Sequence, residues 1–137
     1  MNEQDIKSIH QGPYKLVFVS SGGGTKAISD LLKVPGASQT ILESYIPYSR
    51  QSMDEYLKIK PSYYCSLQTT INMAVTAFER AKKLAPDCDP KYLLGVAVTA
   101  TLSTTYEKLG THRFFICLQG FDATHVVSHY LTKGKRT

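Results

Sequence analysis

Residues 14–25 have the sequence YKLVFVSSGGGT, and this stretch decides the fold class. Its first half is a short run of apolar, β-branched and aromatic residues, which is typical of a buried strand. Two serines and three glycines follow, and from Thr25 onward the apolar residues recur with helical spacing. A buried strand that leads through glycines into a helix indicates a layered α/β domain.

The glycine turn has the composition of a ligand-binding loop. Glycines let backbone N–H groups approach a ligand closely, and a helix N-terminus carries a partial positive charge that suits a phosphate or a carboxylate. Ser20 and Ser21 stand at the end of the predicted strand, where open α/β sheets place ligands. The pattern matches neither the Walker sequence nor the dinucleotide fingerprint. The alternative is a tight turn that needs glycine for its backbone alone.

Helices and strands alternate along the rest of the chain. The spacing of apolar residues predicts helices over 25–33, about 50–59 after an N-cap at Ser49, and about 67–84 after an N-cap at Ser66. Strands are expected to end at Pro47 and to span 93–99, 113–118 and 124–131, while residues 100–110 are loop-like. The strand at 93–99 is apolar on both faces, which is typical of a sheet covered on two sides.

The sequence therefore predicts a single α/β domain with a central, mostly parallel sheet covered by helices. This domain is expected over residues 13–137, after an N-terminal arm over residues 1–12 in which His10 is exposed.

Length and composition fit a small cytoplasmic protein. The chain has 137 residues, 42% of them hydrophobic and 20% charged, so it can bury a core. The sequence has no apolar run long enough for a membrane span, and its first residues are polar, so neither membrane insertion nor secretion is expected. Three widely spaced cysteines argue against a disulfide framework and suit a reducing compartment.

The net charge of +5 does not by itself predict nucleic-acid binding. The basic residues at 80–83 fall in the last turns of a predicted helix, where they complement the helix dipole, and those at 133–136 lie at the chain end. Neither cluster is interleaved with aromatic residues, so a nucleic-acid partner is not expected. His125 and His129 would lie over ~13 Å apart along a strand, and no metal or other cofactor is predicted.

Two further polar residues stand where predicted strands end. Tyr48 follows the strand that ends at Pro47, and its hydroxyl either donates to a substrate oxygen or lies at the rim of the fold. Thr99 ends the central strand, where it either forms a second wall of the pocket or begins an ordinary loop. A binding site would need both residues to lie near the glycine turn.

Five segments, in this order and with these gaps, resemble the CinA C-terminal domain family. They are residues 20–24 (SSGGG), 34–38 (VPGAS), 47–49 (PYS), 65–66 (CS) and 95–99 (GVAVT), and the likeness spans residues 14–137. Bacterial members of this family are nicotinamide-mononucleotide deamidases, hydrolases of NAD metabolism that release ammonia from the carboxamide. Residues 47–50 and 109–113 look most like a eukaryotic branch in which the domain precedes a cytidylyltransferase-like domain.

The resemblance implies roles for individual residues. The family motif ESCTGG falls on residues 19–24, which makes Ser20 the nucleophile and Ser21, Gly22, Gly23 and Gly24 substrate-binding residues. The motif AYSNEAK falls on residues 47–53, which makes Tyr48 the residue that orients the amide. Thr99 and Arg136 match further substrate contacts, Arg136 to a phosphate.

Two departures from the family bear directly on catalysis. The family glutamate is Val19 here, and the family lysine, which is best suited to activate the serine, is Met53; Lys58 and Lys60 are the nearest replacements in sequence. A serine needs a neighbouring base to become a good nucleophile. We therefore expect a nicotinamide-type nucleotide as the ligand and leave two readings open, an amidase and a non-catalytic module that serves a nucleotidyltransferase.

The resemblance also implies assembly into a homo-oligomer. The family's final helix would begin just past Arg136, which leaves open that the sequence is a piece of a longer protein.

Overall fold

A computed structural model describes residues 2–22, 24–100 and 112–131. It contains four α-helices and five strands in these ranges, with two short 3-10 helices, η1 and η2. The elements are α1 (Glu3–Gln11), β1 (Lys15–Ser21), α2 (Thr25–Lys33), η1 (Ala37–Gln39), β2 (Ile41–Tyr45), α3 (Arg50–Leu57), α4 (Leu67–Leu84), η2 (Pro90–Tyr92), β3 (Leu93–Ala100), β4 (His112–Gln119) and β5 (Thr124–Leu131).

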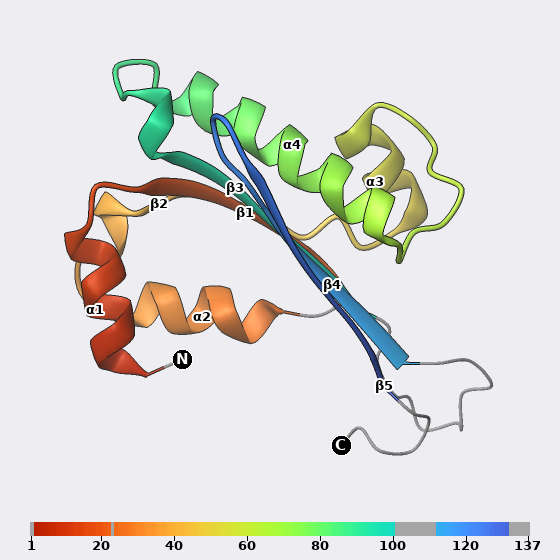
Figure 1. Ribbon diagram of the computed structural model, residues 1–137, viewed down its shortest axis with the longest axis horizontal. Helices are drawn as coiled ribbons and strands as arrows, with labels where there is room; N and C mark the ends of the chain where they lie inside the picture. Colours follow the sequence, from red (N-terminus) through yellow and green to blue (C-terminus); the bar gives the residue numbers. More distant parts are fainter. Residues whose placement is uncertain (1, 23, 101–111, 132–137) are drawn as a thin grey trace.

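The five strands form one sheet in the order β2-β1-β3-β4-β5. The first three are parallel, β4 runs antiparallel to β3, and β5 runs antiparallel to β4. Helix α4 covers one face of the sheet, and α1 and α2 lie on the other (Figure 1). The predicted layered α/β fold with a mostly parallel sheet is confirmed.

Serine caps begin two of the helices where the sequence predicts them. The side chain of Ser49 accepts a hydrogen bond from the backbone N–H of Ser52 at 3.1 Å, and Ser66 does the same for Thr69 at 3.1 Å. Each bond satisfies an N–H group that the first helical turn leaves without a partner. The caps therefore fix where α3 and α4 begin.

Helix α4 packs unusually close to β3 because small residues meet on both sides of the contact. Ala74, Ala77 and Ala81 are fully buried on the helix, and Gly95 lies beneath them on the strand. A methyl group built on Gly95 would lie 2.1 Å from the carbonyl oxygen of Ala74. The absence of a side chain at Gly95 thus sets the distance between the helix and the sheet.

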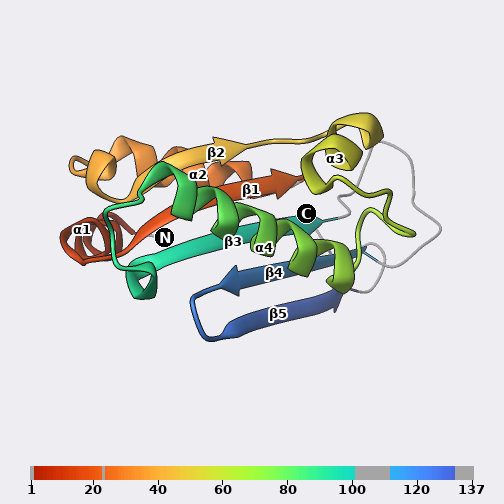
Figure 2. The same cartoon turned by 90° about the horizontal axis from the view of Figure 1, so that it is seen from above.

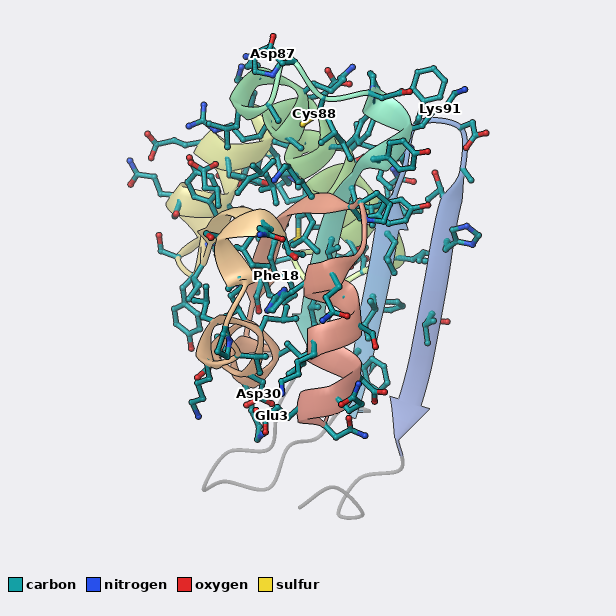
Figure 3. The ribbon with its side chains drawn as sticks, turned by 90° about the vertical axis from the view of Figure 1, so that its left-hand side faces the viewer. Glu3, Phe18, Asp30, Asp87, Cys88 and Lys91 are labelled. Carbon is teal, nitrogen blue, oxygen red and sulfur yellow. The ribbon has the colours of Figure 1, made fainter. Side chains whose placement is uncertain are left out.

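A second core cluster fills the opposite face of the sheet. Phe18, from the middle of β1, packs there with residues from α1, β1 and α2. Figure 3 shows Phe18 inside the fold, beside α1 and α2. The buried members are Ile6, Leu16, Phe18, Ile28, Leu31 and Val34. Ile6 brings α1 into this core, so residues 3–11 pack against the sheet domain.

His10 is buried, so the prediction that it is exposed was wrong. Its Nε2–H donates to the carbonyl oxygen of Leu31 at 2.9 Å, and its Nδ1 lies 2.8 Å from the hydroxyl of Thr40. The carbonyl of Leu31, in the last turn of α2, would normally accept from the residue four positions on, but that residue is Pro35, which has no N–H. The imidazole takes the place of the missing donor.

Replacing His10 with leucine should lower the free energy of unfolding by about 2 kcal/mol, because the Leu31 carbonyl and the Thr40 hydroxyl lose their partner in a buried site. Urea denaturation measures the loss. His125 is exposed on β5, and its replacement by leucine is the matched control, expected to change stability by about 0.5 kcal/mol or less. An equal effect of the two changes would contradict a structural role for His10.

Within residues 2–22, 24–100 and 112–131, no helix combines the length and the apolar composition that a membrane span requires.

Candidate functional site

The carboxyl ends of β1 and β3 lie side by side and place the glycine turn beside Thr99. In the parallel register Ser20 is opposite Val98 and Ser21 is opposite Thr99. After β1 the chain passes through α2 to β2, which is the neighbour of β1 toward one edge of the sheet. It then returns through α4 to β3, which is the neighbour of β1 toward the other edge (Figure 2). Strand β1 is therefore the point at which the strand order reverses, and open α/β sheets bind ligands outside the strand ends at such a point.

The turn after β1 requires glycine for both conformation and space. Gly22 and Gly24 have positive φ angles of 79° and 80°, which residues with side chains rarely adopt. A Cβ atom on Gly22 would lie 2.9 Å from the carbonyl oxygen of Ala100, and one on Gly24 would lie 3.1 Å from the Val98 side chain. The turn is thus folded back against the end of β3. Gly23 lies outside the described residues.

Helix α2 begins at this turn without a side-chain cap. Its N-cap is Gly24, which has no side-chain oxygen for the first backbone N–H groups, and the first turn holds no acidic residue. The carbonyl oxygen of Gly24 accepts from the Ala27 N–H at 3.1 Å. Lys26 in the same turn is exposed and pairs with Asp30 at 2.9 Å, and this pairing lowers the pKa of Asp30. The first-turn amides, together with the helix dipole, suit an anion.

The two serines of the turn face opposite sides of the sheet. Side chains alternate along a strand, so Ser20 lies on the face of Phe18, toward α2, and Ser21 lies on the face of Val19, toward α4. Ser20 has no exposed surface, whereas Ser21 is partly exposed. The structure therefore brings Ser21, rather than Ser20, to the same face as Thr99.

Thr99 takes part in a chain of hydrogen bonds with the first turn of α4. The Thr99 hydroxyl lies 2.7 Å from that of Thr70, which donates to the carbonyl oxygen of Ser66 at 2.7 Å. The Cys65 thiol lies 3.9 Å from the Thr99 hydroxyl. Thr99 is almost fully buried, so its hydroxyl holds α4 on β3. The sequence assigned no role to Thr70 or to Cys65, although residues 65–66 carry part of the family resemblance, because only the fold brings both residues to the end of β3.

Tyr48 takes no part in this chain of hydrogen bonds. Its side chain is 78% exposed and makes no hydrogen bond with the described residues. Both roles expected for Tyr48, a substrate contact and a place at the rim of the fold, stay predictions. Arg136 lies outside the described residues.

The two positions where the family has charged residues belong to one hydrophobic core. Val19 and Met53 are 0% and 1% exposed and lie in the same cluster, together with Met73 and Leu93. Lys58 and Lys60, the nearest lysines after Met53 in sequence, are exposed. Lys58 lines a groove between the end of β2, α3 and α4. That groove encloses about 450 Å³, and its lining includes neither Ser20 nor Thr99.

Tyr56 lines the same groove, where its hydroxyl donates to the carbonyl oxygen of Met73 at 3.4 Å, and burial raises the pKa of Tyr56.

An ion pair links the edge strand β2 to α4. Glu43 of β2 accepts two hydrogen bonds from the Arg80 guanidinium, at 2.8 and 3.1 Å. This pairing raises the pKa of Arg80 and fixes β2 to α4. In the described part of the chain, no three metal-ligating side chains gather at one place.

Comparison with protein-family models and with curated proteins gave no match. Solved structures do match. A competence/damage inducible protein from Agrobacterium tumefaciens is 16% identical with a TM-score of 0.69, over 96% of this chain and 78% of its own. CinA superfamily proteins from Escherichia coli and Enterobacter cloacae are 15% and 14% identical, with TM-scores of 0.68 and 0.71, over 95% of this chain and 74% and 76% of theirs. At these identities the likeness establishes the fold, and the chain has the CinA-like fold that its sequence resemblance predicts.

Proposed function

We propose that this CinA-like domain binds a nicotinamide-type nucleotide at the turn after β1 and does not hydrolyse it. The observation that carries the proposal is the uncapped glycine turn at the point where the strand order reverses. Gly22 and Gly24 hold the turn against β3, and no side chain caps the first amides of α2. The phosphate of the nucleotide is the group that these amides suit.

The buried Val19–Met53 core argues against hydrolysis. Attack on a carboxamide by Ser20 requires a base that accepts the serine proton, and the resemblance assigns that role to a lysine at position 53. Methionine cannot accept a proton, and Met53 is enclosed in the hydrophobic core. Ser20 is itself without exposed surface, so a substrate could reach it only if the surroundings moved.

The test is a calorimetric titration with nicotinamide mononucleotide, followed by an assay for ammonia on the same sample. We expect saturable binding without ammonia. Ammonia release that Ser20→Ala abolishes would establish the amidase instead, and release that Ser20→Ala leaves unchanged would remove Ser20 from any catalytic role. Absence of binding would overturn the proposed site. The eukaryotic branch and the nucleotidyltransferase partner remain predictions from the resemblance.

Gly24→Ala should weaken nucleotide binding by roughly tenfold or more, because the added methyl group strains the left-handed residue from which the α2 amides start. Gly36→Ala is a matched control at the other end of α2. Its φ is 99°, and its Cβ would lie 3.2 Å from His10, so it meets similar strain and crowding far from the turn. We expect both variants to lose about 1 kcal/mol of stability and only Gly24→Ala to lose affinity. Equal losses of affinity would place the ligand elsewhere.

A further inference from the structure

The groove between the end of β2, α3 and α4 is separate from the proposed nucleotide site. Figure 2 shows α3 following the end of β2 and lying beside α4. The groove encloses about 450 Å³, which is within the usual size range of small-molecule pockets. None of the described residues of the turn after β1 lines it. This β2–α3–α4 groove therefore has no role in the function proposed for the turn.

One part of the β2–α3–α4 groove is aromatic and apolar. Tyr45 and Tyr56 both line it, and their ring centroids lie 5.3 Å apart at an interplanar angle of 53°. The Tyr56 hydroxyl donates to the carbonyl oxygen of Met73 in α4, so the polar end of this side chain is already satisfied within the protein. Ile46, which follows β2, extends the apolar lining and is 53% exposed. This part of the groove suits a flat apolar ring.

The cations of the groove outnumber its anions once ion pairs within the protein are set aside. Arg80 and Glu79 each form an ion pair with a residue outside the lining, at 2.8 and 3.0 Å. The charged lining residues that form no ion pair with a described residue are Glu55, Lys58 and Lys83. Two lysines and one glutamate give the groove a net positive charge, which favours a ligand with an acidic group.

Lys58 has a backbone conformation that disfavours a side chain. It ends α3 in the left-handed region, with a φ of 63° and a ψ of 16°. Among the described residues it is the only one other than glycine with a positive φ. Glycine is the usual residue after the end of a helix, because a Cβ atom makes this conformation unfavourable. Strain of this kind is typical of residues whose side chain has a function.

We propose that the β2–α3–α4 groove binds a small aromatic acid, a planar ring that carries a carboxylate or a phosphate. The ring packs against Tyr45 and Tyr56, and the acidic group pairs with Lys58 and Lys83. The volume of the groove favours a small molecule over a protein partner, because a stable protein interface covers a far larger surface. The domain would then hold two ligand sites, one at the turn after β1 and one in this groove.

Titration of the full chain with cinnamate and with phenyl phosphate, followed through backbone amide chemical shifts, tests the groove at ligand concentrations up to roughly 5 mM. Cinnamate carries a carboxylate and phenyl phosphate a phosphate, and saturable shifts over residues 45–58 and 76–83 with either one support the site. Cinnamyl alcohol keeps the ring and lacks the charge. It should bind roughly threefold more weakly than cinnamate, or less, because it cannot pair with the lysines.

Lys58→Gly and Lys83→Ala should each raise the dissociation constant of the bound acid roughly threefold or more. Lys60→Ala is the matched control, since it removes the same charge from an exposed lysine outside the groove lining. It should leave the dissociation constant unchanged. Lys58→Gly should also raise the midpoint of urea denaturation, because glycine adopts the left-handed conformation without strain. A lysine kept for structure alone would give an equally tight complex in this variant.

Three results would overturn the proposal. The first is the absence of saturable shifts with both acids, and the second is equal binding of cinnamyl alcohol and cinnamate. The third is an affinity for the acid that Lys58→Gly and Lys83→Ala change no more than Lys60→Ala does. Shifts confined to residues 24–27 would likewise place the acid at the turn and overturn the groove site. The groove lining excludes the described turn residues, so failure of the groove site would leave the proposed nucleotide site standing.

Discussion

Gly95→Ala should lower the free energy of unfolding by about 3 kcal/mol or more. The new methyl group would lie 2.1 Å from the Ala74 carbonyl oxygen and 2.4 Å from the backbone nitrogen of Phe78. Both are backbone atoms of α4, so no side-chain rotation relieves the contact, and the whole helix would have to move away from β3. That movement would also disturb the fully buried Ala77. Urea denaturation, with circular dichroism as the signal, measures the loss.

Gly120→Ala is the control for this change. A Cβ atom on Gly120 would meet its nearest neighbours at 3.6 Å, which is ordinary van der Waals contact. We expect a change of about 0.5 kcal/mol or less. If Gly95→Ala were no more destabilising than Gly120→Ala, the close approach of α4 and β3 would be incorrect.

Met53→Lys should destabilise the domain by about 3–5 kcal/mol, although it restores the residue that the family has at this position. The ammonium group would enter a hydrophobic cluster at a site only 1% exposed, where no described residue offers a carboxylate in that cluster. Met53→Leu keeps the site apolar at similar volume and should cost less than about 1.5 kcal/mol. Comparison of the two variants by denaturation separates the effect of charge from that of shape.

The double variant Val19→Glu/Met53→Lys shows whether the two positions interact. A buried carboxylate beside the ammonium should offset part of its cost, so the double change should be less destabilising than the sum of the single changes. Strict additivity would show that the two side chains do not meet. The double variant is also the form in which to look for ammonia release, because it restores both residue types that the resemblance places there.

Local sequence signals predicted the elements of the fold well. Helices over 25–33 and 67–84 have the expected bounds, and the caps at Ser49 and Ser66 form the expected hydrogen bonds. The alternation at 124–131 correctly indicated an outer strand. These features depend on neighbours in sequence, namely the capping residue, the apolar period and the glycines that end a strand.

The site could be predicted only in part, because its details depend on residues that are distant in sequence. The glycine turn after β1 and the position of Thr99 beside it could be predicted, because β1 and β3 are parallel strands that end at the same edge of the sheet. That Thr99 bonds to Thr70 depends on how closely α4 approaches the sheet, and Gly95 sets that distance. Likewise, the hydrogen-bond partners of the buried His10, Leu31 and Thr40, lie 21 and 30 positions away, and the sequence of residues 1–12 does not predict these contacts. Long-range contacts of this kind leave no periodic signal.

The hydrogen bond from His10 to Leu31 has a mechanical consequence for the proposed binding turn. Helix α2 is held at its carboxyl end by α1 and begins at Gly24. A helix of nine residues is stiff over its length of about 14 Å, so it transmits position from one end to the other. Helix α1 thus fixes the carboxyl end of α2, and through the rigid helix it fixes the position of the first amides of α2, which the proposal assigns to the ligand. Removal of the His10 imidazole, unlike the crowding of its Cβ atom by Gly36→Ala, would take away this support without any change at the turn itself.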